Sequence, residues 1–219
     1  MSALWVEWLG TLPYGDALSL QLDAIEERRR GGPDRLLLLE HPAVITLGRS
    51  ARPENLRSSR EELARRGIEV IEVARGGDVT WHGPGQLVGY AIADLEARGE
   101  PDASLWLRRI EAALIDALGA LGVGARRIPG RTGVFLEKPV DGSTRKIASI
   151  GVGLRGWISW HGFALNVTTA SDAFWDVVPC GLHDVRMTSL AEALGAEPTP
   201  DLFDGARAEV AAAFVRALT

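Results

Sequence analysis

One cysteine and one lysine are the residues best suited to nucleophilic chemistry in this sequence. Cys180 lies between Pro179 and Gly181, where the backbone is expected to turn sharply, and Lys146 opens the small and apolar run KIASIG. A free thiol has a pKa of about 8.5, and an adjacent cation favours the thiolate, which is the reactive form. Because a Cys/Lys pair needs no histidine, the two residues predict a nucleophile. A small buried cysteine and a solvent-facing lysine remain the alternatives.

A glycine-rich stretch, RGGDVTWHGPGQLVGY at residues 75–90, is the second candidate element. We expect its backbone N–H groups to face a ligand, with Arg75 and His82 supplying charge or hydrogen bonds. The stretch matches neither G-x-G-x-x-G nor the P-loop, so phosphate binding is not favoured. An elaborate hairpin loop is the alternative. The reason for expecting a ligand is the number of glycines, which exceeds what a loop between two strands needs: Gly76, Gly77, Gly83 and Gly85.

Two histidines occur in identical Trp-His-Gly triplets, His82 and His161. Neither has a second ligand at metal-binding spacing, and the chain has a single cysteine, so neither a metal site nor an internal disulfide is expected. Histidines bonded to backbone in crowded turns are the alternative. Asn166 is expected to orient a loop. The apolar segments 147–152 and 163–167 could line a slot for an alkyl chain or be plain core.

The composition excludes several classes of partner. The chain of 219 residues has a net charge of −5 and a pI near 5.5, whereas nucleic-acid binding requires a basic face. No apolar run approaches the roughly 20 residues that span a bilayer. The N-terminal MSALWVEWLG has no basic region of the kind that begins a secretory signal. We therefore expect a cytoplasmic protein with neither a nucleic-acid partner nor a membrane partner.

The hydrophobic pattern predicts one mixed α/β domain over residues 1–219, in which helices cover a mixed sheet. The first long helix should bury Leu18, Leu22 and Ile25, and Asp102 or Ser104 should cap the second. Strands are expected at Trp5–Leu9, Arg35–Glu40, Ala43–Leu47, Ile68–Ala74, Leu87–Ala93, Val123–Arg126, Gly133–Leu136, Lys146–Leu154 and Trp157–Val167. Helices are expected at Tyr14–Arg30, Arg60–Arg66, Ser104–Leu121, Ser171–Trp175, Ser189–Leu194 and Leu202–Leu218.

Four motifs in fixed order resemble those of the lipoyl (octanoyl) transferase family: RGGDVTWHGPGQLVGY, KIASIG, WHGFALNV and PCG. The resemblance runs from about Leu36 to Leu194, and HPAVITLGR also fits. It implies a fold like the catalytic module of biotin and lipoate protein ligases. It also implies transfer of an octanoyl group from octanoyl-acyl carrier protein to a lysine of a lipoyl domain. The implied acceptors are the lipoyl domains of 2-oxoacid dehydrogenase complexes and the glycine cleavage H protein.

The same resemblance implies which residues act. Cys180 matches the cysteine that carries the acyl thioester, and Lys146 matches the lysine that lowers the pKa of that cysteine. No cofactor and no metal is implied. Trp81 and Trp160 stand where Tyr or Phe is usual, and Phe135 where Trp is common, which alters the shape of the pocket. The segment formed by residues 138–144 is longer than usual and is expected to form a surface hairpin. The implied substrate-contacting residues are Arg75, Gly76, Gly77, Asp78, Val79, Thr80, Trp81, His82, Ser149, Ile150, Gly151, Gly162, Phe163 and Ala164.

The mechanism that the resemblance implies begins with attack of the Cys180 thiolate on the octanoyl thioester, a near-thermoneutral exchange that needs no ATP. Lys146, neutral once the thiolate has been consumed, then accepts the proton of the attacking amine. Backbone N–H groups of the glycine-rich stretch or near Cys180 hold the oxyanion. Two alternatives stay open. One is an ATP-dependent lipoate or biotin ligase, which also uses a lysine on the corresponding strand, and the other is a non-catalytic module that binds lipoyl domains or acyl carrier protein.

Overall fold

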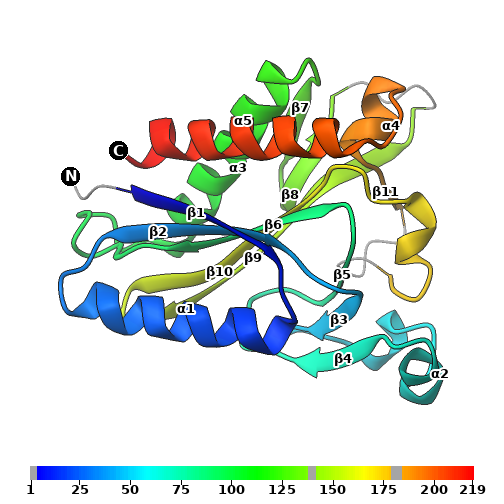
Figure 1. The fold of residues 1–219 in the computed structure, drawn as a ribbon, viewed down its shortest axis with the longest axis horizontal. Coiled ribbons are helices and arrows are strands. Elements are labelled where there is room, and N and C mark those ends of the chain that lie inside the picture. Colours follow the sequence, from blue (N-terminus) through cyan, green and yellow to red (C-terminus); the bar gives the residue numbers. More distant parts are fainter. Residues whose placement is uncertain (1–3, 138–141, 179–183) are drawn as a thin grey trace.

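A mixed sheet of eight strands dominates the computed structural model, which describes residues 4–137, 142–178 and 184–219 (Figure 1). Seven of these strands have the order β1-β2-β6-β10-β9-β8-β7, and β11 pairs with β9. Within this sheet β1 pairs with β2 in parallel, β11 pairs with β9 in parallel, and the other pairs are antiparallel. A second sheet has the order β4-β3-β5. The predicted mixed α/β architecture is therefore confirmed.

The two longest strands of the described chain, β9 (Thr144–Arg155) and β10 (Ile158–Asn166), pair with each other. The other strands are β1 (Leu4–Thr11), β2 (Asp34–Glu40), β3 (Val44–Leu47), β4 (Glu69–Glu72), β5 (Val79–His82), β6 (Gln86–Ile92), β7 (Ala125–Ile128), β8 (Arg131–Leu136) and β11 (Val185–Met187). The helices are α1 (Tyr14–Arg29), α2 (Arg60–Arg65), α3 (Ala103–Ala120), α4 (Leu190–Leu194) and α5 (Pro200–Leu218), with 3-10 turns η1 (Pro53–Asn55) and η2 (Ser171–Phe174).

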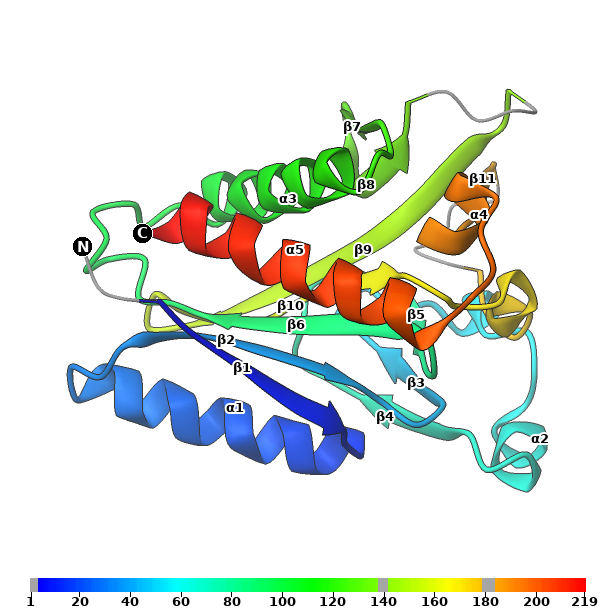
Figure 2. The ribbon, with the colours of Figure 1, turned by 45° about the horizontal axis from the view of Figure 1, so that its top comes forward.

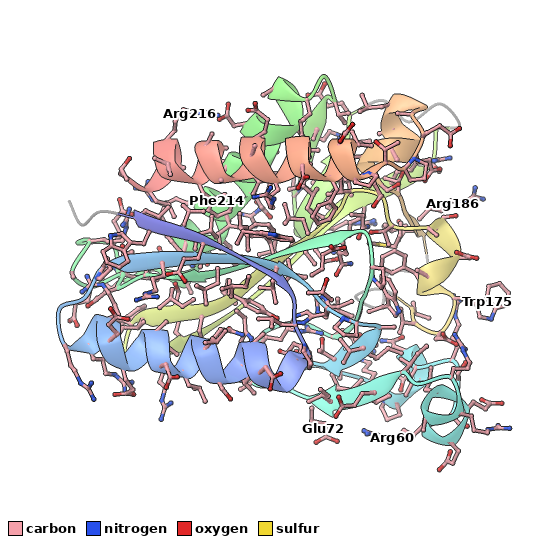
Figure 3. The ribbon with its side chains drawn as sticks, in the orientation of Figure 1. Arg60, Glu72, Trp175, Arg186, Phe214 and Arg216 are labelled. Atoms are coloured by element: carbon pink, nitrogen blue, oxygen red, sulfur yellow. The ribbon has the colours of Figure 1, made fainter. Side chains whose placement is uncertain are left out.

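Helices cover both faces of the main sheet. Helix α1 lies on one face, and α3 and α5 lie side by side on the other (Figures 1 and 2). On α5, Phe214 points toward the sheet and stacks on Phe163 of β10, with ring centroids 4.9 Å apart, whereas Arg216 points outward (Figure 3). Strand β2 shows why the layers hold together: its continuous run of leucines is buried on both faces, as a strand between two helical layers requires.

The buried face of α1 differs from the predicted one. Ile25 is buried as expected, but Leu18 and Leu22 are only half-buried. The helix instead turns Ala17 and Ala24 toward the sheet, which allows a close approach, together with the fully buried Gln21. Leu22 packs at the edge of the same buried cluster as Ile25, so the predicted face is confirmed for these two residues and wrong for Leu18, which does not belong to the cluster.

The predicted start of α3 is confirmed. Asp102 caps the helix, and its carboxylate accepts hydrogen bonds from the backbone N–H groups of Ser104 and Leu105 at 2.7 and 3.1 Å. Two strands, β5 and β11, were not predicted from the sequence. Both are short, and each is stabilised by a distant partner, β3 for β5 and β9 for β11. In the part of the chain that the structure describes, no helix is long and apolar enough to cross a membrane.

Asp34, at the start of β2, joins several elements through its fully buried carboxylate. The carboxylate accepts hydrogen bonds from Arg28 Nε of α1 at 2.7 Å and from Arg98 Nη1 in the loop after β6 at 2.6 Å. Arg98 also donates to the carbonyl of Leu218 at the end of α5. A buried, hydrogen-bonded carboxylate of this kind is far more sensitive to substitution than an exposed ion pair.

We therefore expect Asp34→Asn to lower the free energy of unfolding by about 3 kcal/mol, because it removes the carboxylate that two partly buried guanidinium groups share. The matched control is Asp116→Asn, which removes the exposed pair with Arg216 and should cost less than about 1 kcal/mol. Urea unfolding followed by circular dichroism measures both. Equal losses in the two variants would contradict the role assigned to Asp34.

Candidate active site

The glycine-rich stretch forms a loop between β4 and β5, followed by β5 itself and β6. The loop packs through its main chain on the segment after β3: the carbonyls of Arg75 and Gly77 accept hydrogen bonds from the N–H groups of Arg49 and Ser50, both at 3.1 Å. The Gly76 N–H donates to the carbonyl of Val152 on β9 at 2.9 Å. The loop is therefore fixed against the edge of β9, where β8 no longer pairs with it.

Several of the glycines serve close packing. The N–H groups of Gly76 and Gly85 were expected to face a ligand, but both are hydrogen-bonded within the protein. The Gly85 N–H donates to Glu40 Oε1 at 2.7 Å. A Cβ on Gly83 would lie 2.3 Å from the Trp81 ring, and one on Gly151 of β9 would lie 2.8 Å from the Gly76 carbonyl oxygen. The surplus of glycine in this stretch thus lets segments approach one another, and the ligand-facing interpretation does not hold for Gly76 and Gly85.

Arg75 and Asp78 hold the loop in shape. The buried Arg75 guanidinium donates from Nε and Nη2 to the Thr46 hydroxyl, at 3.1 and 2.8 Å, and from Nη1 to the Gly76 carbonyl at 3.0 Å. The Asp78 carboxylate accepts from the N–H groups of Arg52 and Val79 at 3.1 and 2.8 Å. Both side chains therefore pre-organise the loop.

A narrow slot of about 40 Å³ lies between this loop and strands β9 and β10 on the α1 face of the sheet. The antiparallel register places Ser149 opposite Ala164 and Gly151 opposite Gly162 along it. Three further lining residues, Tyr14, Val88 and Tyr90, come from α1 and β6. Of the residues named from the sequence, the slot brings together Arg75, Gly77, Asp78, Thr80, His82, Ser149, Ile150, Gly151, His161, Gly162, Phe163 and Ala164.

Other residues named from the sequence lie elsewhere. Val79 and Trp81 point into a separate cluster of the second sheet, where the Trp81 ring meets Phe174 edge to face with centroids 5.4 Å apart. Trp160 packs on the α1 side and stacks on His161. Cys180 and most of the predicted 138–144 hairpin lie outside the described residues.

Lys146 lies near the start of β9 and is 1% exposed. Its Nζ is 5.8 Å from the centroid of the Phe135 ring on β8, in a cation–π arrangement. Gly133 of β8 makes room for the side chain, because a Cβ there would lie 2.5 Å from Lys146 Cε. The amine of Lys146 therefore sits against buried surface, and the solvent-facing alternative is wrong.

Three buried histidines differ in how their rings are satisfied. His41 donates from Nδ1 to the Leu12 carbonyl and accepts from the Tyr90 hydroxyl at Nε2, both at 2.7 Å. His82 donates from Nδ1 to Gln86 Oε1 at 2.7 Å, and its Nε2 faces the Thr46 hydroxyl at 3.5 Å. Neither ring nitrogen of His161 has a hydrogen-bond partner among the described residues. The described residues contain no group of three or more side chains placed to hold a metal ion.

A chain of hydrogen bonds runs from His82 toward Lys146. Gln86 Nε2 donates to Asn166 Oδ1 at 3.0 Å, and Asn166 Nδ2 donates to the Thr188 carbonyl at 2.9 Å. The Thr188 N–H in turn donates to the Lys146 carbonyl at 3.0 Å. Asn166 therefore holds the segment that follows β11 beside β9, in agreement with its predicted role in orienting a loop. Gln86 carried no comparable sequence signal, because only the fold brings it to Asn166.

A larger cavity of about 540 Å³ opens on the other side of the loop. It shares Gly77, Asp78, Ile150 and Gly151 with the slot. Its remaining walls come from η1 and the preceding segment, from the turn between β7 and β8, and from Leu107 of α3. Two adjoining spaces thus meet at the glycine-rich loop, one narrow and one wide.

This fold is found in lipoate protein ligases. The chain superposes on the bi-partite lipoate protein ligase of Thermoplasma acidophilum with a TM-score of 0.74 at 19% identity, covering 100% of this chain and 84% of that one. A lipoate-protein ligase A bound with ATP gives a TM-score of 0.69 at 18% identity, covering 99% and 85%. The architecture is therefore that of a lipoate-ligase-type catalytic module.

Sequence comparison identifies the family. The model of the lipoyl protein ligase A/B catalytic domain matches residues 13–214, and the chain belongs to this family. It is 48% identical over 189 residues to the octanoyltransferase of Koribacter versatilis, covering 85% of this chain and 74% of that one. It is 45% identical over 195 residues to the octanoyltransferase of Mycobacterium leprae, covering 89% and 80%. The protein is an acyltransferase.

The burial of two histidines predicts how stability depends on pH. Desolvation lowers the pKa of both His82 and His161 to about 3 in the folded protein, whereas histidines in an unfolded chain titrate near 6.5. Between these values the unfolded chain binds more protons, so the free energy of unfolding should fall as the pH drops from about 6.5. The slope is at most about 1.4 kcal/mol per pH unit for each histidine.

Urea unfolding at pH 7, 6 and 5 measures this slope, and His82→Gln should flatten it by removing one titrating ring. Ring resonances of His82 and His161 followed by NMR should stay neutral at pH 5. Titration of either ring near pH 6.5 would contradict the assigned environment.

Proposed function

We propose that this protein transfers an octanoyl group from octanoyl-acyl carrier protein, through a thioester on Cys180, to a lysine of lipoyl domains. The proposed acceptors are the lipoyl domains of 2-oxoacid dehydrogenase complexes and the glycine cleavage H protein. The observation that carries the proposal is the buried amine of Lys146, placed on the same strand as the residues that line the slot. The identity to octanoyltransferases supports the acyl group named here.

The choice of lysine at position 146 is informative. Among 24 lysines and arginines, only Lys138 and Lys146 are lysines. An arginine stays charged under all ordinary conditions, whereas a buried lysine can release its proton. Since arginine is the usual basic residue of this chain, a lysine at a buried position indicates a site where proton transfer is needed.

The described residues that flank Cys180 in sequence lie next to the larger cavity. The Val178 N–H donates to the carbonyl of Asn55 at 2.8 Å, and Asp184 forms an ion pair with Arg131 at 2.7 Å. Asn55 and Arg131 both line that cavity. Farther along, Met187 pairs with Lys146 in the sheet. These contacts hold the described residues on either side of Cys180 beside the larger cavity and beside β9, which supports the role proposed for Cys180.

In the proposed reaction the Cys180 thiolate attacks the thioester carbonyl, and the carrier sulfur leaves as a thiol with the ammonium proton of Lys146 as the new thioester forms, which leaves Lys146 as the neutral amine. One thioester replaces another, so the step requires no ATP. The acceptor amine then attacks the acyl-enzyme, its proton passes to Lys146, and the amide forms as the Cys180 thiolate is released. The slot holds the acyl chain, and the wider cavity admits first the donor and then the acceptor lysine.

The first test is formation of the acyl-enzyme. Mixed with an octanoyl thioester in the presence of chelator and apyrase, the protein should gain one octanoyl group on Cys180, and the group should disappear when apo lipoyl domain is added. Intact-protein and peptide mass spectrometry show both steps, with Cys180→Ser as the control. A requirement for ATP would place the protein with the ligases, and an adduct that forms equally in the control would remove the thioester from the mechanism.

The second test addresses Lys146. Lys146→Met keeps most of the side-chain volume but removes the amine, so the protein should fold while octanoyl transfer falls by roughly 10²- to 10⁴-fold. Lys138→Met, which changes the only other lysine, is the matched control and should transfer at the normal rate. Single-turnover kinetics measure both. Transfer in Lys146→Met within about fivefold of the unmodified protein would exclude a role in proton transfer.

A further inference from the structure

His161 stands apart from the other two buried histidines. The residue is 2% exposed and lines the slot, yet neither Nδ1 nor Nε2 has a partner in the parts of the chain that the structure describes. His41 and His82, by comparison, have a partner or a facing hydroxyl at both ring nitrogens. Buried polar atoms in proteins are almost always hydrogen-bonded, so an exception requires an explanation.

The backbone of His161 is held in an unusual conformation. Its φ of 57° falls in the left-handed region, although it lies within strand β10. Gln21 of α1, itself buried, accepts the His161 backbone N–H at 2.8 Å. The His161 ring stacks on the Trp160 ring with centroids 4.1 Å apart. It lies edge to face with the Tyr90 ring, with centroids 6.3 Å apart. Strain of this kind persists where the surroundings enforce it, and it clusters at ligand sites.

The register locates His161 relative to Lys146. His161 pairs with Val152, which is six residues beyond Lys146 on β9, or about 20 Å at 3.3 Å per residue. Ser149, opposite Ala164, lies midway between them. The slot therefore runs from the level of Ser149, about 10 Å along β9 from Lys146, to the level of His161. At this distance His161 cannot exchange a proton with groups near Lys146.

The stretch of β9 from the level of Ser149 to the level of His161 matches a medium acyl chain in length. Eight carbons joined by bonds of about 1.5 Å span roughly 9 Å when extended, which is close to the three-residue rise of about 10 Å from Ser149 to Val152. A chain that begins near Ser149 therefore ends at the level of His161. A methyl group placed there offers no hydrogen bond to the imidazole.

We propose that His161 is the polar end of the acyl slot and limits the chain to about eight carbons. The inference rests on the proposed function, which sets the direction of the chain. The neutral ring presents one N–H donor and one acceptor lone pair, which a longer alkyl chain would cover without satisfying. An octanoyl chain stops short of the ring, whereas a polar group at the end of a chain of this length can bond to it. His161 is thus a specificity-determining residue.

The test compares acyl-enzyme formation from octanoyl, decanoyl and 8-hydroxyoctanoyl thioesters. In His161→Phe, which keeps a ring of similar size without its polar atoms, the decanoyl-to-octanoyl rate ratio should rise about tenfold, and the 8-hydroxyoctanoyl-to-octanoyl ratio should fall about tenfold. Trp175→Phe, which alters an exposed ring outside the slot lining, is the control and should leave both ratios within about twofold. Unchanged ratios in His161→Phe would overturn the proposal.

A second measurement separates this inference from the proposed function and does not depend on the folding of His161→Phe. In Cys180→Ser with ¹⁵N-labelled histidine, 8-hydroxyoctanoate should shift the ring nitrogens of His161 and bind more tightly than decanoate. If 8-hydroxyoctanoate gives this result but the unmodified protein forms no adduct on Cys180, the polar end of the slot is supported and the thioester mechanism is excluded. Binding of decanoate as tight as that of 8-hydroxyoctanoate, with no shift at His161, would defeat the polar end itself.

Discussion

The antiparallel pairing of β9 with β10 is the interaction on which the site depends. Its register sets Gly151 against Gly162 and Ser149 against Ala164, and so fixes both walls of the slot at once. The same strand carries Lys146 at one end and accepts the glycine-rich loop at the other, through Val152. A slip of one residue would turn every side chain of β9 to the opposite face, so the pairing must be specified strongly. The leucines of β2 and the stacking of Phe163 on Phe214 supply that specification from both layers.

Buried polarity is concentrated around this strand pair. Lys146 lies against Phe135, Arg75 against Thr46, and the rings of His41 and His82 are bonded into the scaffold. Each of these groups is costly to bury unless it is satisfied or used. Most are satisfied by neighbours, which keeps the loop rigid. Of the two that chemistry or recognition would employ, the His161 ring lines the slot, and the Lys146 amine lies farther along β9, beyond Ser149.

Sequence reasoning found most elements and most of the slot, because periodicity and motif order are local properties. It placed β9, β10 and α3 within a few residues, and twelve of the residues that it named line one slot. On α1 it predicted the buried face only in part, because small residues and not Leu18 face the sheet. It missed β5 and β11, because the strands that pair with them are distant in the sequence. It assigned Trp81 to the substrate, although the side chain alternation of β5 directs the ring into the second sheet. His41, Tyr90 and Gln86 could not be found, since only the fold brings them to the site.

The proposed mechanism requires Lys146 to change its protonation state as Cys180 gains and loses the acyl group. With only two lysines in the chain, ¹⁵N-lysine NMR reports on this amine directly, and Lys138→Arg assigns its signal. We expect the Lys146 signal to shift when Cys180 is octanoylated, while the Lys138 signal stays unchanged. A Lys146 signal that is the same with and without the octanoyl group would contradict this mechanism.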